Sequence, residues 1–229
     1  MSTIREITYL ILDELKLSSD DSTFTENHII YLINNYRALL LKQRYSDIKK
    51  TIPSSNYIEI CLEMEEFKSP PSRPCEEDFY YIRSTKKIPS LMSSGNTKVY
   101  NNTYFNYEIP YINRERFNYV GYSKYVNNTI YSTRGADGFL YLKSKSTNIN
   151  NLKNLKMYAL FQDVIEASEL LCDNIKACNI LDREFPLENA LIPPLVQLVV
   201  EELRKSIYLP EDKENNADDD LSDINIKQR

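Results

Sequence analysis

The chain has 229 residues, of which 42% are hydrophobic and 27% are charged, a composition that supports a folded core. The formal net charge of -5 hides two poles, because residues 79–160 carry twelve Lys or Arg against three Asp or Glu, whereas residues 161–229 carry seven against sixteen. No apolar run has the length of a membrane span and no signal peptide is visible, which argues against a membrane or secreted protein and favours synthesis in a cytoplasm.

Two amphipathic helices are predicted at the N-terminus. Thr3 and Glu6 have the spacing of a capping box before a helix from Ile4 to Leu17, whose apolar stripe is Ile4, Ile7, Ile11 and Leu15. After a polar turn, Thr25 offers an N-cap to a second helix over 26–45, with apolar positions Ile29, Leu32, Ile33, Tyr36, Leu39 and Leu40. The short turn favours a helical hairpin.

The hydrophobic period then changes to two. Residues 58–65 alternate apolar and polar side chains, which is typical of a half-buried strand. Further strands are predicted over 79–83 and 155–161, and a hairpin joins 129–133 to 139–143 through a turn that contains Gly135 and Gly138. An antiparallel sheet therefore occupies the middle of the chain.

Helices return after this sheet. Asp163 is predicted to open a helix that runs to about Lys176, and Pro193 and Pro194 occupy the first turn of a helix that ends near Leu209. The remaining residues are too polar to form a core. The predicted class is α+β, with residues 1–56 and 162–209 as a helical bundle, 57–161 as an antiparallel β extension and 210–229 as a flexible acidic tail.

Residue types that carry catalysis are scarce. His28 is the only histidine and lies in the first turn of a predicted helix, and the four glycines form no phosphate-binding loop. Glu59, Glu63 and Glu65 fit the solvated face of a strand, and the four cysteines, which lack metal-site spacing, are expected to be reduced thiols. We therefore expect no enzyme, no metal and no cofactor.

The basic centre suggests an interaction surface. Tyrosines alternate there with the basic residues Lys98, Arg114, Arg116, Lys124 and Arg134. Lysine, arginine and tyrosine suit a nucleic-acid-binding module, but tyrosine and arginine are also enriched at protein interfaces. The acidic pI near 5.2 favours the protein interface. A secreted β-rich adhesin remains a third alternative, disfavoured by the missing signal.

Three stretches resemble a known family. They are the helical region 4–45, the segment MYALFQDVIEA at 157–167 and the acidic segment PEDKENNADDD at 210–220. Together with the order of the predicted elements, they resemble the head-to-tail connector proteins of short-tailed phages, which are tail-tubular or adaptor ring proteins found also in crAss-like phages.

This resemblance implies a non-enzymatic virion protein that assembles as a ring, commonly a dodecamer, beneath the portal and around the channel through which DNA leaves. It also implies that the C-terminal segment grips the portal protein and that the β extension meets the next ring or tail component. The implied portal-binding residues are Pro210, Glu211, Asp212, Asn215, Asn216, Asp218, Asp219 and Asp220.

Overall fold

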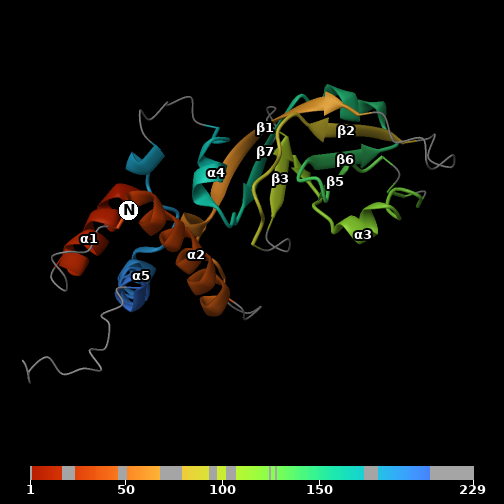
Figure 1. Cartoon of the computed structure of the whole chain (residues 1–229). Helices are drawn as coiled ribbons and strands as arrows, with labels where there is room; N and C mark the ends of the chain where they lie inside the picture. Colours follow the sequence, from red (N-terminus) through yellow and green to blue (C-terminus); the bar gives the residue numbers. More distant parts are fainter. Residues whose placement is uncertain are drawn as a thin grey trace, which may run out of the picture.

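The computed structural model describes residues 2–16, 24–45, 51–67, 79–92, 97–101, 107–123, 125–126, 128–172 and 180–206. It confirms the predicted α+β class. The long helices from both ends of the chain gather on one side, and the strands lie on the other side (Figure 1).

The three long helices are α1 (Ile4–Lys16), α2 (Glu26–Arg44) and α5 (Ile192–Ser206). Short helical pieces are η1 (Ser54–Asn56), α3 (Arg114–Phe117), η2 (Thr147–Asn151), α4 (Val164–Ser168), η3 (Ile180–Asp182) and η4 (Asn189–Leu191). The strands are β1 (Ile58–Glu66), β2 (Tyr80–Ser84), β3 (Lys98–Asn101), β4 (Glu108–Ile109), β5 (Tyr131–Arg134), β6 (Leu140–Ser144) and β7 (Asn154–Ala159).

The seven strands form one antiparallel sheet in the order β4-β3-β7-β1-β2-β6-β5. Its two edges meet, because the segment after β4 bridges β5: Ile112 N–H donates to the Ser132 carbonyl, and Ser132 N–H donates to the Pro110 carbonyl, each at 2.9 Å. The sheet thus closes into a small barrel, which pairs part of the β4 and β5 edges that an open sheet would present. The predicted hairpin over 129–143 is confirmed as β5 and β6.

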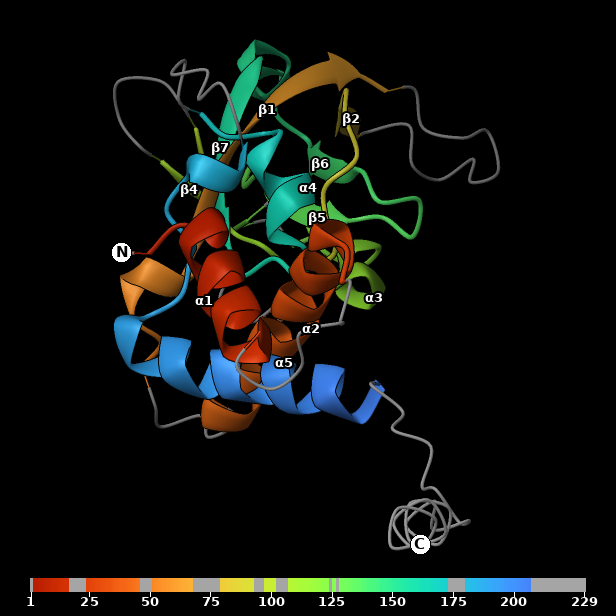
Figure 2. The same cartoon turned by 60° about the vertical axis from the view of Figure 1, so that its left-hand side comes forward.

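One hydrophobic core joins the barrel and the helices. The barrel is filled by alternate residues of neighbouring strands, such as Ile60 opposite Met157 and Val99 opposite the same Met157. This cluster continues into the helices, where the predicted stripe of α1 is fully buried, and α5 runs across α1 and α2 (Figure 2). The helical end and the barrel therefore share one hydrophobic core.

Local signals predicted the helix starts well. Thr3 and Glu6 form the expected capping box, with reciprocal hydrogen bonds of 3.0 and 3.1 Å between side chains and backbone amides. Thr25 precedes α2 as predicted but makes no capping hydrogen bond with its side chain.

The helix expected from Asp163 to Lys176 is much shorter. Asp163 does cap α4, but the helix ends at Ser168 because the following residues turn back to the barrel. There Leu170 accepts a hydrogen bond from Cys61 N–H at 2.8 Å, and Leu171 bridges Ile60. Because β2 pairs with β1 only from Met64 onward, the first half of β1 has one unpaired edge, and the residues after α4 pair there instead of continuing the helix.

The buried face of α2 also differs from the predicted one. Leu39, expected in the apolar stripe, is 41% exposed, while Arg37 is fully buried. The Arg37 guanidinium donates to three backbone carbonyls: Nε to Pro186 at 2.9 Å, Nη1 to Phe161 at 2.8 Å and Nη2 to Asn56 at 3.0 Å. Burial lowers the pKa of Arg37 to about 9, which leaves the side chain cationic at neutral pH.

We predict that Arg37→Met lowers the free energy of unfolding by about 3 kcal/mol, because three buried carbonyls lose their donor and each costs about 1 kcal/mol or more. Urea unfolding followed by circular dichroism measures this change. The matched control is Lys42→Met on the same helix, since Lys42 is exposed and a surface substitution of this kind changes the free energy of unfolding by less than about 1 kcal/mol. Equal unfolding midpoints for Arg37→Met and the wild type would contradict the assigned role.

A disulfide joins Cys61 of β1 to Cys172, 111 residues later. The expectation of reduced thiols is therefore wrong for this pair. The cause is the same return of the chain after α4, which brings the two α-carbons to 4.8 Å, a separation that a disulfide can span. Linear spacing carried no hint of the pairing.

Reduction of this disulfide is expected to lower the free energy of unfolding by about 4 to 5 kcal/mol, because the unfolded chain regains the entropy that a crosslink across 111 residues removed. Thermal unfolding with and without reductant measures the difference. Cys61→Ser with Cys172→Ser should remove the response to reductant, whereas Cys75→Ser with Cys178→Ser should keep it. A non-reduced, denatured sample in which four thiols titrate would refute the crosslink.

Candidate interaction surfaces

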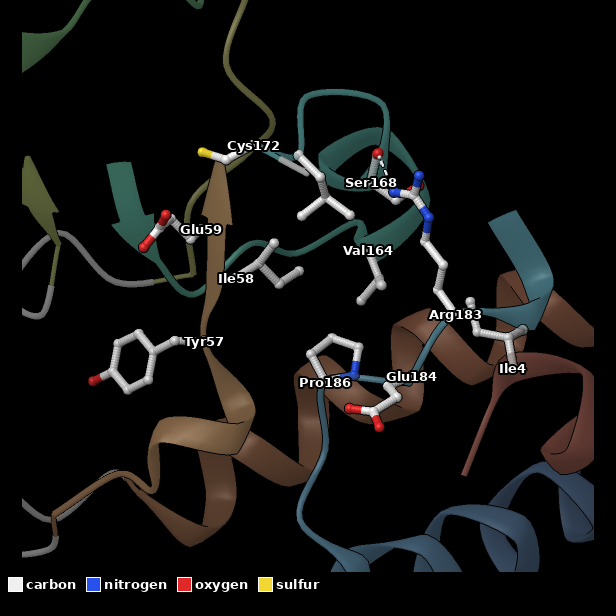
Figure 3. Close-up of a pocket in the computed structure, with 11 residues that line it drawn as sticks. Ile4, Tyr57, Ile58, Glu59, Val164, Ser168, Cys172, Arg183, Glu184 and Pro186 are labelled. Carbon is white, nitrogen blue, oxygen red and sulfur yellow. Dashed lines mark hydrogen bonds between the residues drawn. The ribbon is translucent and has the colours of Figure 1, made fainter. Parts of the chain in front are cut away.

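A cavity of about 380 Å³ lies where the helices meet the barrel. Figure 3 shows Ile4 of α1, Ile58 of β1 and Val164 of α4 around it, with Arg183 and Glu184 at its rim. Arg183 donates to the Ser168 carbonyl at 2.8 Å and so fastens the segment before α5 to α4. The residues that line the cavity include no nucleophile paired with a base.

The acidic face of β1 is occupied by ion pairs. Glu59 contacts Lys156 of β7 with 2.8 Å between carboxylate and ammonium, and Glu65 pairs with Arg83 of β2. These are cross-strand pairs on the outside of the barrel. Within the described ranges, no group of three His, Cys, Asp or Glu is arranged to hold a metal ion, and no helix is long and apolar enough to cross a membrane.

The predicted basic residues are distributed over several elements. Arg114 and Arg116 are exposed on α3, and Lys98 is exposed on β3. Arg134 ends β5 half-buried and donates to the Ile88 carbonyl at 3.3 Å. Lys124 lies outside the described residues, as do all the tail residues from Pro210 to Asp220. Of the five predicted basic residues, only Arg114 and Arg116 lie on the same element, α3. A single patch of all five stays a prediction.

The structure adds two lysines that the sequence analysis missed. Lys143 and Lys145 of β6 and its following turn place their ammonium groups 4.1 and 5.0 Å from the centre of the Phe79 ring. Tyr122 packs edge-on against Phe79 at 5.1 Å, and Lys143 also donates to the Asn118 carbonyl at 3.4 Å. Alternation in the strand was the available signal, because it puts both lysines on one face.

Exposed aromatic and basic side chains occur close together along α3 and the turns that follow it. We name this surface the Tyr/Arg patch and define it as Arg114, Arg116, Tyr119, Tyr122 and Tyr125, all on α3 and the turns that follow it. Tyr119 is 82% exposed and Tyr125 is 93% exposed. The patch lies on the barrel, which fixes its position through Phe79 and the lysines below it.

A second surface lies on the outer face of α1. Tyr9 and Leu10 are each about half-exposed, and Glu6, Asp13 and Glu14 surround them. Helical spacing of three and four residues places these side chains on one face, opposite the buried isoleucines. We call it the α1 face. It combines apolar surface with negative charge, whereas the Tyr/Arg patch combines aromatic surface with a net positive charge, because two arginines outnumber the exposed Glu115 between them.

Comparison with known proteins assigns the family. Residues 6–221 match the family model described as phage tail ring protein 2. The chain is 49% identical to "Ring protein 2" of Bacteroides phage crAss001 over 223 residues, which cover 96% of this chain and 99% of that protein. The matched region includes the long helices, the barrel and the first part of the C-terminal segment. The chain therefore belongs to the phage tail ring protein 2 family of the crAss-like phages and is a structural component of the virion.

Proposed function

We propose that this chain is the protomer of a ring in the head-to-tail connector, which joins the portal to the tail and surrounds the channel through which DNA leaves. The observation that carries the proposal is the family match over residues 6–221, together with the similarity to a protein named "Ring protein 2". A dodecamer is the proposed copy number, in line with the resemblance to adaptor ring proteins.

The described surfaces support an assembly role. Two exposed surfaces of opposite charge, the Tyr/Arg patch and the α1 face, would both be covered in an assembly of many contacts.

The C-terminal segment is proposed to bind the portal protein. The family match ends at residue 221, so it includes Pro210–Asp220 and stops before the last eight residues. Acidic and amide side chains in this segment suit a partner surface with basic groups and backbone donors. The barrel is proposed to meet the next ring or tail component on the other side.

Light scattering of the full chain mixed with the cognate portal tests this function. We expect a stoichiometric large complex with the full chain and none with a chain that ends at Leu209, because the truncated chain lacks the binding segment. The matched control is a chain that ends at Leu221, which keeps the whole matched region and should bind like the full chain.

Two results would contradict the proposal. Failure of the full chain to bind the portal would remove the connector function. Equal binding by the chain that ends at Leu209 would leave the connector function in place but move the portal contact to another surface.

A further inference from the structure

The Tyr/Arg patch is unusual for a surface that remains in water. Tyr119 and Tyr125 expose almost their whole side chains, and Tyr122 beside them is 53% exposed. Large aromatic side chains and arginine are the residues that contribute most to protein interfaces. A cluster of this composition predicts a partner.

The patch is also held in a fixed shape. Gly121 has a positive φ of 86°, and a β-carbon added there would lie 2.8 Å from the Phe79 ring, so the turn is pressed against the barrel. Tyr119 N–H donates to the Arg116 carbonyl at 3.0 Å, which fastens the turn to α3. A preorganised surface loses little conformational entropy when it binds.

The α1 face is complementary to this patch. Its centre is apolar, with Tyr9 49% and Leu10 50% exposed, and its border contains the carboxylates of Asp13 and Glu14. Two cations of the helix lie near this face: Lys16 forms an exposed ion pair with Asp13 at 3.9 Å, which is weak in water, and Arg5 lies beside Tyr9 but pairs with Asp182. Aromatic rings of the patch fit the apolar centre, and its arginines fit the carboxylates.

The two surfaces cannot meet within one copy. Figure 1 shows α1 at one end of the molecule and α3 at the other. In a closed ring of identical subunits, each contact joins two different surfaces of neighbouring copies. Such a contact requires two complementary surfaces at different ends of the subunit.

We propose that the Tyr/Arg patch of one copy docks on the α1 face of the next copy, so that this contact closes the ring. The inference rests on the proposed function, because it requires that the chain forms a ring. A second copy covers both surfaces at once, whereas a nucleic acid would cover only the basic patch and leave Leu10 and its carboxylates in water.

Charge reversal of each surface tests the contact. One variant is Arg114→Glu with Arg116→Glu, and the other is Asp13→Lys with Glu14→Lys. We expect each variant alone to self-associate about tenfold more weakly than the wild type, because like charges face each other at every contact. A one-to-one mixture should recover association, since each variant then presents the charge that the other lacks.

Self-association is measured by sedimentation of the full chain at high concentration and low salt, alone and on the portal. The matched control is Lys86→Glu with Lys153→Glu, which reverses two exposed basic residues of the barrel outside the patch and should associate like the wild type. Recovery in the mixture also shows that both variants are folded.

Three outcomes overturn the inference. The first is wild-type association in the charge-reversed variants, and the second is a wild-type chain that stays monomeric even on the portal. In the third, Arg114→Glu with Arg116→Glu keeps self-association but loses salt-sensitive binding of duplex DNA, which would assign the patch to nucleic acid. Failure of the connector function appears separately, as a wild-type chain that does not bind the portal.

Discussion

The Arg37 guanidinium connects the three places where the chain passes between the helices and the barrel. Asn56 lies just before β1, Phe161 lies just after β7, and Pro186 lies on the way to α5. A buried cation is costly to desolvate, and no carboxylate is among its hydrogen-bond partners, so backbone dipoles stabilise the charge. The planar fork of donors holds the three carbonyls around one guanidinium and so links the barrel to the helices.

A firm link between barrel and helices matters for the proposed assembly because the two candidate docking surfaces belong to different ends of the molecule. The α1 face is part of the helical end, and the Tyr/Arg patch is part of the barrel. A rigid subunit turns a fixed angle between its two surfaces into a fixed rotation per copy, and that rotation determines whether a ring closes. The disulfide between Cys61 and Cys172 reinforces the same junction from the side of β1.

Barrel closure also limits which strand edges can pair with another molecule. An open seven-stranded sheet would leave β4 and β5 as edges that pair with strands of any neighbour. Since the segment after β4 already pairs with β5 at Ser132, that part of the β5 edge is not available to a strand of a neighbour. Side-chain surfaces differ in shape and charge, whereas an unpaired strand edge can pair with many other strands. Closure therefore favours specific side-chain contacts over non-specific strand pairing.

The sequence by itself determined the features that depend on neighbouring residues: the α1 stripe with its capping box, the proline-rich start of α5, the hairpin of β5 and β6, and the α+β class. The resemblance to connector ring proteins also came from the sequence, and the family match confirms a crAss-like phage ring protein. Only the tertiary structure decided that Arg37 is buried, that α4 is short, that Cys61 meets Cys172 and that the sheet closes. The physical reason is that periodicity reports which face of an element is buried, whereas the partner that buries it lies far along the chain, and a local pattern contains no information about that partner.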